Sequence, residues 1–227
     1  MPIECTAILF DLDGVLIDST QSITHLWEQW AQRHDLDLGA IMQVAYGRRA
    51  VDTIRLVAPQ LAAEQEAHAL AALEVADLHG VVVIDGAAPL LMGLPAGTWA
   101  IVTSGARAVV TARLQSLGLP LPTVLVTAED VVKGKPDPEP YLAAAARLGV
   151  AAAHCVVIED SPAGIAAALA AGMRAVGVAS THAVPELASA TAIARHLADL
   201  QVDRGSDGGL EIRIVDPEHA SSTGRMR

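Results

Sequence analysis

The sequence predicts an α/β protein that has a Rossmann-like, doubly wound parallel sheet and an inserted all-α cap. Short apolar segments that do not alternate with polar residues are typical of parallel strands covered on both faces. Helical segments lie between these strands from about residue 98 to residue 180, as in doubly wound folds. The stretch at 19–84, directly after the first strand, has helical spacing and no convincing core strand.

Five apolar segments are the expected strands of the sheet, at residues 7–10, 99–102, 124–126, 155–158 and 175–178. The helices between them are expected at 107–117, 138–148 and 162–171. Ser161 and Pro162 suit the N-cap and the first position of the third helix. Residues 210–215 alternate in polarity and are expected to add an edge strand.

The cap is expected to contain helices at 22–34, 53–57 and 64–79. Trp27 and Trp30 share one face of the first of these, either as cap core or as a wall against a substrate. The hinges are expected near 17–19 and 85–89. The resulting division is a core of 1–18 and 85–216, a cap of 19–84 and a disordered tail of 217–227.

Composition and charge exclude several classes of protein. The chain has 227 residues, and 15 basic against 26 acidic residues give a net charge of −11, which disfavours nucleic acid as a partner. No apolar run reaches the length of a membrane span, and no leader sequence is evident, so we expect a cytoplasmic protein without a membrane partner. Cys5 and Cys155 indicate neither a disulfide framework nor a metal cluster. A monomer and a homodimer both remain open.

The strongest chemical motif comes directly after the first expected strand. Asp11 and Asp13 lie two residues apart, at the edge where open α/β sheets bind ligands. Two neighbouring buried acids require a cation or a proton, and carboxylate oxygens suit Mg²⁺. Gly14 would let the chain turn away sharply. Residues 11–14 could also form a plain turn, although the buried strand that precedes them disfavours that interpretation.

Polar residues also follow the next three expected strands, and parallel strands would bring them to the same edge. They are Thr103, Ser104 and Gly105, then Lys135, then Glu159 and Asp160. The first group offers hydroxyls and backbone N–H groups to an anion, but it is also ordinary N-cap chemistry. A single loop lysine is usually a solvated charge, but Pro136 next to Lys135 would stiffen this loop.

Together these four segments closely resemble the motifs of the haloacid dehalogenase-like superfamily, over about residues 1–200. The segments around Lys135 and Glu159 resemble the β-phosphoglucomutase and sugar-phosphatase branch. Residues 103–107 further resemble the phosphatases of glycerol phosphate and 2-deoxyglucose phosphate and bacterial sugar phosphatases. The resemblance implies that Asp11 is a nucleophile which forms an aspartyl-phosphate and that Asp13 is the general acid and base. Because a dehalogenase needs no acid for its leaving group, Asp13 favours phosphate esters as substrates.

The resemblance also implies a cofactor and a binding site for the phosphoryl group. Mg²⁺ would be held by Asp11, the backbone carbonyl of Asp13, Asp160 and Glu159. The phosphoryl oxygens would be bound by Lys135, by Gly105 and by the hydroxyl of either Thr103 or Ser104.

In this branch a cap loop near Arg48, Arg49 and Asp52 reads the leaving group, and these three side chains could bind hydroxyls of a sugar or polyol. Each could equally be a surface charge beside a helix start. The two adjacent arginines, Arg48 and Arg49, would also suit a second anionic group on the substrate.

We therefore expect a Mg²⁺-dependent phosphatase of a small sugar or polyol phosphate. A sugar-phosphate mutase is the alternative, but the place of the cap histidine of β-phosphoglucomutases is occupied by Ile23, and His25 would point elsewhere. A non-catalytic sugar-phosphate binding protein is less consistent with a complete set of motifs.

Overall fold

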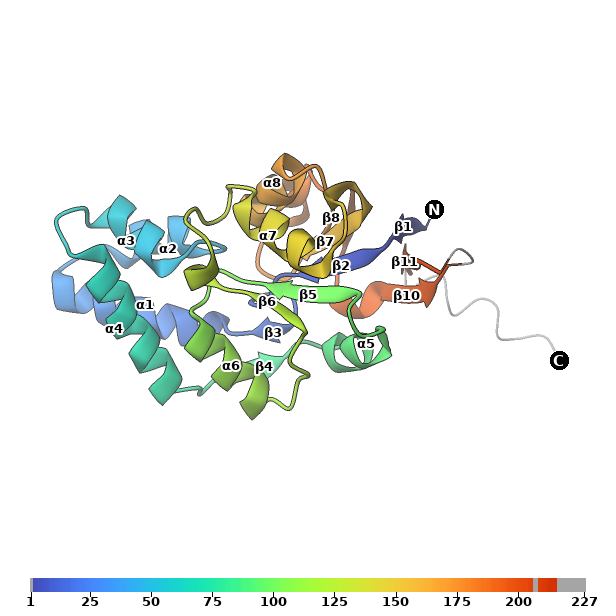
Figure 1. The fold of residues 1–227 in the computed structure, drawn as a ribbon. Coiled ribbons are helices and arrows are strands. Elements are labelled where there is room, and N and C mark those ends of the chain that lie inside the picture. Colours follow the sequence, from blue (N-terminus) through green and yellow to red (C-terminus); the bar gives the residue numbers. More distant parts are fainter. Residues whose placement is uncertain (1, 206–207, 216–227) are drawn as a thin grey trace.

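The central sheet of the protein has six parallel strands in the order β6-β5-β2-β7-β8-β9 (Figure 1). The computed structural model describes residues 2–205 and 208–215, so the predicted tail at 217–227 lies outside the described residues. The strands are β2 (Ala7–Phe10), β5 (Trp99–Val102), β6 (Val124–Val126), β7 (Cys155–Glu159), β8 (Arg174–Val178) and β9 (Ala192–Ala194). All five predicted strands are confirmed, and β9 is an additional one.

Helices cover both faces of this sheet, as the sequence predicts. They are α5 (Ala87–Gly93), α6 (Arg107–Ser116), α7 (Glu139–Leu148) and α8 (Pro162–Ala170). Side chains of a strand alternate between the faces. On β2, Ile8 and Phe10 belong to the apolar cluster that includes α5 and α6, whereas Ala7 and Leu9 belong to the cluster that includes α7 and α8. Both faces of β2 are therefore buried, which explains its uninterrupted apolar sequence.

Four helices form a separate bundle beside the sheet (Figure 1). They are α1 (Thr20–His34), α2 (Leu38–Ala45), α3 (Ala50–Val57) and α4 (Ala63–Ala76). The bundle has its own apolar core, in which the rings of Trp27 and Trp30 meet edge to face with centroids 5.3 Å apart. The sequence does not predict α2, because its nearly all-apolar sequence has no helical period. We call α1–α4 the helical bundle.

The chain crosses between the bundle and the sheet twice, through a pair of short strands. These are β3 (Ile17–Asp18) and β4 (Val82–Val83), which pair antiparallel. The crossings lie at 17–18 and 82–83, and the hinges are predicted near 17–19 and 85–89. Within the described residues, no helix is long and apolar enough to cross a membrane.

A second, antiparallel sheet packs at the far end of the molecule (Figure 1). Its order is β1 (Ile3–Cys5), β11 (Leu210–Ile214) and β10 (Leu200–Arg204). Residues 210–215 are therefore not an edge strand as predicted, because β11 lies between two partners. Leu210 and Ile212, its inward residues, join the same apolar cluster as Ile8 and Phe10 of β2.

Candidate active site

The predicted motifs meet at the carboxyl-terminal edge of the central sheet, next to the helical bundle. Asp11 follows β2, Thr103 follows β5, and Asp160 follows β7. A cavity of about 680 Å³ opens between this edge and the bundle. Its lining includes Asp11, Asp13 and Asp160 from the sheet edge as well as residues of α1, α3 and α4.

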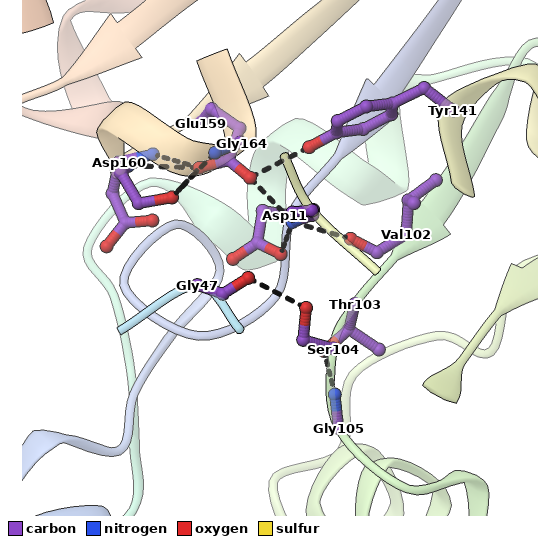
Figure 2. A network of polar contacts seen from close by, with 12 residues as sticks. Asp11, Gly47, Val102, Thr103, Ser104, Gly105, Tyr141, Glu159, Asp160 and Gly164 are labelled. Carbon is purple, nitrogen blue, oxygen red and sulfur yellow. Dashed lines mark hydrogen bonds and ion pairs between the residues drawn. The ribbon is translucent and has the colours of Figure 1, made fainter. Parts of the chain in front are cut away.

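Three buried carboxylates lie together at this edge (Figure 2). Asp11, Glu159 and Asp160 each offer an oxygen atom, and these atoms all lie within 4.8 Å of one another. The ammonium group of Lys135 joins them, 2.5 Å from Asp11 Oδ1 and 2.5 Å from Glu159 Oε1. Burial lowers the pKa of Lys135, but the two carboxylates raise it by more, so Lys135 stays charged.

Glu159 is completely buried, and both of its oxygen atoms accept hydrogen bonds. Oε1 accepts from Lys135 and, at 2.8 Å, from the hydroxyl of Tyr141. Oε2 accepts from the backbone N–H groups of Asp160 and Ser161 and from Ser161 Oγ at 2.9 Å. The side chain of Glu159 therefore holds Lys135 in place and shapes the turn before α8.

The start of α8 fits closely against this carboxylate. Ser161 is the N-cap, since its Oγ accepts from Gly164 N at 3.1 Å, and Pro162 is the first helical residue, as predicted. A Cβ atom on Gly164 would lie 1.7 Å from Glu159 Oε1. Only glycine at position 164 therefore leaves room for Glu159.

Asp160 lies against the turn that follows Asp11. Gly14 has φ +86°, and a Cβ atom there would lie 2.0 Å from Asp160 Oδ2. Thr181 Oγ1 donates a hydrogen bond to the same oxygen. The predicted sharp turn at Gly14 thus brings the Asp160 carboxylate close to the backbone after β2.

The charges of this cluster fit a divalent cation. Three carboxylates face one ammonium group, which leaves an excess of negative charge in a buried site. Burial raises the pKa of Asp11 to about 7, with Lys135 opposing the shift, and burial and the neighbouring carboxylates raise the pKa of Asp160 well above its usual range. A bound cation would remove this penalty, and an all-oxygen donor set suits Mg²⁺.

The carboxylate of Asp13 is not part of this cluster. Its Oδ1 accepts from Ser19 Oγ at 2.6 Å and from Arg113 Nη1 at 2.8 Å. The other terminal nitrogen of Arg113 donates to Glu74 Oε2 of α4 at 2.7 Å. Burial raises the pKa of Glu74 to about 7, although Arg113 lowers it.

The segment after β5 lies between Asp13 and the helical bundle. Thr103 is buried, and its Oγ1 accepts from Gly105 N at 3.0 Å, which leaves its own O–H group to donate. Ser104 Oγ instead donates to the backbone carbonyl of Gly47 at 2.8 Å (Figure 2). Gly47 has φ +73°, and a Cβ atom there would lie 2.5 Å from Ser161 Oγ, so the loop after α2 sits directly on the sheet edge.

The three residues predicted to bind substrate from the bundle have different environments. Arg48 lines the cavity, and its side chain makes no hydrogen bond or ion pair with any described residue. Arg49 is buried, with its guanidinium bonded to Asp52 and to the carbonyls of Ala128, Val131 and Val132.

The predicted substrate-binding role of Arg49 and Asp52 therefore does not match their contacts. Arg49 also lines the cavity, but its guanidinium donates five hydrogen bonds to four groups of the protein, the Asp52 carboxylate and three backbone carbonyls. Asp52 is outside the described lining of the cavity and is paired with Arg49 and Arg55. Arg49 connects the start of α3 to the loop before Lys135, and Asp52 pairs with Arg49. Of the three residues, Arg48 is the one whose side chain has no partner among the described residues.

The comparisons with known proteins agree with this geometry. A family model described as haloacid dehalogenase-like hydrolase matches residues 5–172. The chain belongs to the haloacid dehalogenase-like hydrolases. Hexitol phosphatase A of Escherichia coli is 38% identical over 221 residues, which cover 92% of this chain and 100% of that protein. Glycerol-1-phosphate phosphohydrolase 2 of Saccharomyces cerevisiae is 36% identical over 194 residues, which cover 80% and 77%.

The solved structures include a similar hydrolase from Pseudomonas syringae. It has a TM-score of 0.73 and 27% identity and covers 86% of this chain and 95% of that one. The family predicted from the four motifs is thereby confirmed. The predicted α/β Rossmann-like core and the prediction that the protein is an enzyme are confirmed as well.

Four residues that contact the predicted site residues of this hydrolase are not predicted from the sequence. They are Ser19, Arg113, Tyr141 and Thr181. A signal exists for Arg113, because it shares its helix face with the buried residues Val109, Val110 and Leu114. A charged residue on an apolar stripe indicates a buried partner. Tyr141 and Thr181 reach the site only through tertiary packing.

Proposed function

We propose that this hydrolase is a Mg²⁺-dependent phosphatase of a small sugar or polyol phosphate and that it works through an aspartyl-phosphate on Asp11. The arrangement of Asp11 and Asp13 carries the proposal. Asp11 lies beside a buried ammonium group at 2.5 Å, whereas Asp13, two residues on, is held separately by two hydrogen-bond donors. Such different environments suit a nucleophile and an acid–base group. The names of the two relatives support the substrate class.

The reaction takes place in two steps. A carboxylate oxygen of Asp11 attacks phosphorus, the bond from phosphorus to the ester oxygen breaks, and Asp13 gives its proton to the departing alkoxide. Asp13 then takes a proton from water, which attacks the phosphorus of the aspartyl-phosphate. The bond to Asp11 breaks, and inorganic phosphate leaves with both carboxyl groups restored.

The protein neutralises the charge that develops on the phosphoryl oxygens. Lys135 is fixed by Glu159 and so places its ammonium group next to Asp11 at no cost of reorientation. Thr103, rather than Ser104, is the proposed hydroxyl donor, because Ser104 already donates to Gly47. Mg²⁺, held by Asp11, Asp160 and the backbone carbonyl of Asp13, would supply further positive charge against the phosphoryl group when bound. Glu159 is assigned to Lys135, since both of its oxygens are engaged.

The leaving group would occupy the cavity on the side of the helical bundle. Ile23, Leu26 and Trp27 line that side, and Arg48 is the proposed polar contact to a hydroxyl group. The place of a mutase histidine is taken by Ile23, whereas the side chain of His25 is 62% exposed and contacts Gln29. This placement favours the phosphatase over the mutase.

A panel of phosphomonoesters tests this function. The purified protein is incubated with hexitol, hexose and glycerol phosphates in the presence of Mg²⁺, and phosphate release is compared with that of Asp11→Asn. We expect release from at least one ester, loss of that release with EDTA and its recovery with added Mg²⁺. Release no greater than that of Asp11→Asn across the panel would refute the proposal, and a strict requirement for a sugar bisphosphate with isomerised product would identify a mutase.

A further inference from the structure

A buried arginine that the reaction described above does not use joins Asp13 to the helical bundle. Arg113 lies on α6 and is 2% exposed. Its guanidinium binds two carboxylates from different parts of the chain, Asp13 after β2 and Glu74 on α4. Burying an arginine costs free energy that such pairs often only offset, and an apolar side chain would serve stability as well. The arrangement therefore points to a role in the reaction.

The contacts of Asp13 show what this arginine does. Oδ1 accepts from both Arg113 and Ser19, at 2.8 Å and 2.6 Å. Oδ2 has no hydrogen-bond partner among the described residues, and it lies on the side of Gly105, whose Cβ position would be 4.0 Å away. With Oδ1 held by two donors, the carboxyl group cannot rotate freely, and Oδ2 is the oxygen that faces the segment after β5.

Glu74 in turn holds Arg113. It accepts from the second terminal nitrogen of Arg113 at 2.7 Å, and it lines the cavity. Without Glu74, the ion pair to Asp13 would be the one remaining contact between the guanidinium of Arg113 and a carboxylate among the described residues. A fork of two N–H donors bound to two carboxylates has a defined plane, which a single contact would not give.

We propose that Arg113 is a positioning residue for Asp13, and that Glu74 of the helical bundle fixes Arg113 so that Oδ2 of Asp13 faces the oxygen of the leaving group. The proposal rests on the phosphatase reaction proposed above, because it concerns the transfer of a proton to that oxygen. It assigns to α4 a part in placing the acid, in addition to lining the cavity.

The test compares two substrates whose leaving groups differ in their need for a proton. An alkyl phosphate that the panel identifies as a substrate needs the acid, whereas p-nitrophenyl phosphate releases a stable phenolate without it. The value of kcat/KM reports the steps up to release of the alcohol. For Arg113→Met we expect kcat/KM to fall by about 100-fold with the alkyl phosphate and by less than about threefold with p-nitrophenyl phosphate.

A second readout follows from the second step. Because hydrolysis of the aspartyl-phosphate still needs Asp13 as a base, Arg113→Met should release a rapid burst of p-nitrophenol, followed by slow turnover. Asp13→Asn should show the same pattern. Arg213→Met, which removes an exposed arginine from the second sheet, is the control and should behave as the wild type on both substrates.

Glu74→Ala tests the contribution of the helical bundle. We expect the same selective pattern with a smaller loss, about tenfold, since Arg113 keeps its contact to Asp13. Circular dichroism verifies that each variant is folded. Equal losses on both substrates for folded Arg113→Met would overturn the positioning role, and an unchanged Glu74→Ala would overturn the role of α4. Wild-type protein inactive on every ester would instead refute the proposed function itself.

Discussion

Lys135 Nζ lies 2.5 Å from Glu159 Oε1, and both side chains are almost completely buried. The two residues come from different parts of the chain, the loop before α7 and the end of β7. Both oxygens of Glu159 accept hydrogen bonds from protein donors, and one of these donors is the ammonium group that Glu159 shares with Asp11. A buried ion pair of this kind gains little for stability, but it fixes a positive charge where the proposed phosphoryl group binds.

Replacing the lysine tests this role. Lys135→Met keeps a long side chain and removes the charge, so we expect phosphatase activity to fall by about 100- to 1000-fold. The measurement is phosphate release at saturating Mg²⁺, with circular dichroism to verify folding. Lys133→Met is the matched control, because Lys133 lies in the same loop and its side chain is 72% exposed. Similar activities of the two folded variants would argue against the assignment.

Gly164 provides a steric test of the same group. A methyl group there would overlap Glu159 Oε1, so Gly164→Ala must displace the carboxylate and its contact with Lys135. We expect the free energy of unfolding to fall by about 2 kcal/mol or more, together with a loss of activity. Urea denaturation and the phosphate assay measure the two effects.

Gly93→Ala is the matched control for that substitution. Gly93 ends α5, and a Cβ atom there has no atom within 4 Å. We expect unchanged activity and a stability that is equal or higher by up to about 1 kcal/mol, because alanine restricts the unfolded chain. A loss of stability at Gly93 as large as that at Gly164 would show that overlap with Glu159 is not the cause.

The sequence was sufficient to predict the sheet and its polar edge, for physical reasons that these residues illustrate. A strand buried on both faces, such as β2, needs an uninterrupted apolar sequence, and parallel strands bring their carboxyl ends together. Asp11, Thr103, Lys135 and Asp160 could therefore be grouped without a structure. The short strands β1, β3 and β4 carry too few residues to show a period.

The contacts of the arginines could not be predicted in the same way. Arg48 and Arg49 are adjacent and chemically identical, and both line the cavity, yet only the guanidinium of Arg49 is bonded to carbonyls about 80 residues further along the chain. Which of them turns inward depends on the packing of α3 against the loop at 128–132. The orientation of Arg113 likewise depends on distant partners, Asp13 in the loop after β2 and Glu74 on α4.

Arg49 should therefore matter for stability. Its guanidinium donates to Val131 O at 2.9 Å and to Val132 O at 2.8 Å, so Arg49→Met would remove the donor of these carbonyls and leave Asp52 with Arg55 alone. We expect the free energy of unfolding to fall by about 3 kcal/mol. Arg55→Met, on the same helix but with a half-exposed side chain, should cost less than about 1 kcal/mol. Chemical denaturation compares the two, and equal costs would contradict the buried role of Arg49.

Asp130 gives the protein a defined dependence of stability on pH. Although burial raises its pKa, hydrogen bonds from Thr127 and Arg147 and the charge of Arg107 hold it at about 2, below the usual 3.8. Because the pKa is lower in the folded state, the carboxylate stabilises the fold fully above about pH 4 and loses this effect as the pH falls toward 2. Because Arg107 and Arg147 are nearly half exposed, solvent screens these contacts, and we expect a full effect of about 1 kcal/mol, about half of it lost by pH 3.

Asp130→Asn removes this contribution at every pH. We expect the free-energy difference between wild type and variant, from urea denaturation, to shrink by about 0.5 kcal/mol between pH 6 and pH 3. Asp203→Asn, which changes an exposed carboxylate on β10, should keep a nearly constant and small difference over the same range. A difference for Asp130→Asn that stays constant, or grows, as the pH falls would show that the hydrogen bonds to Asp130 do not stabilise its ionised form.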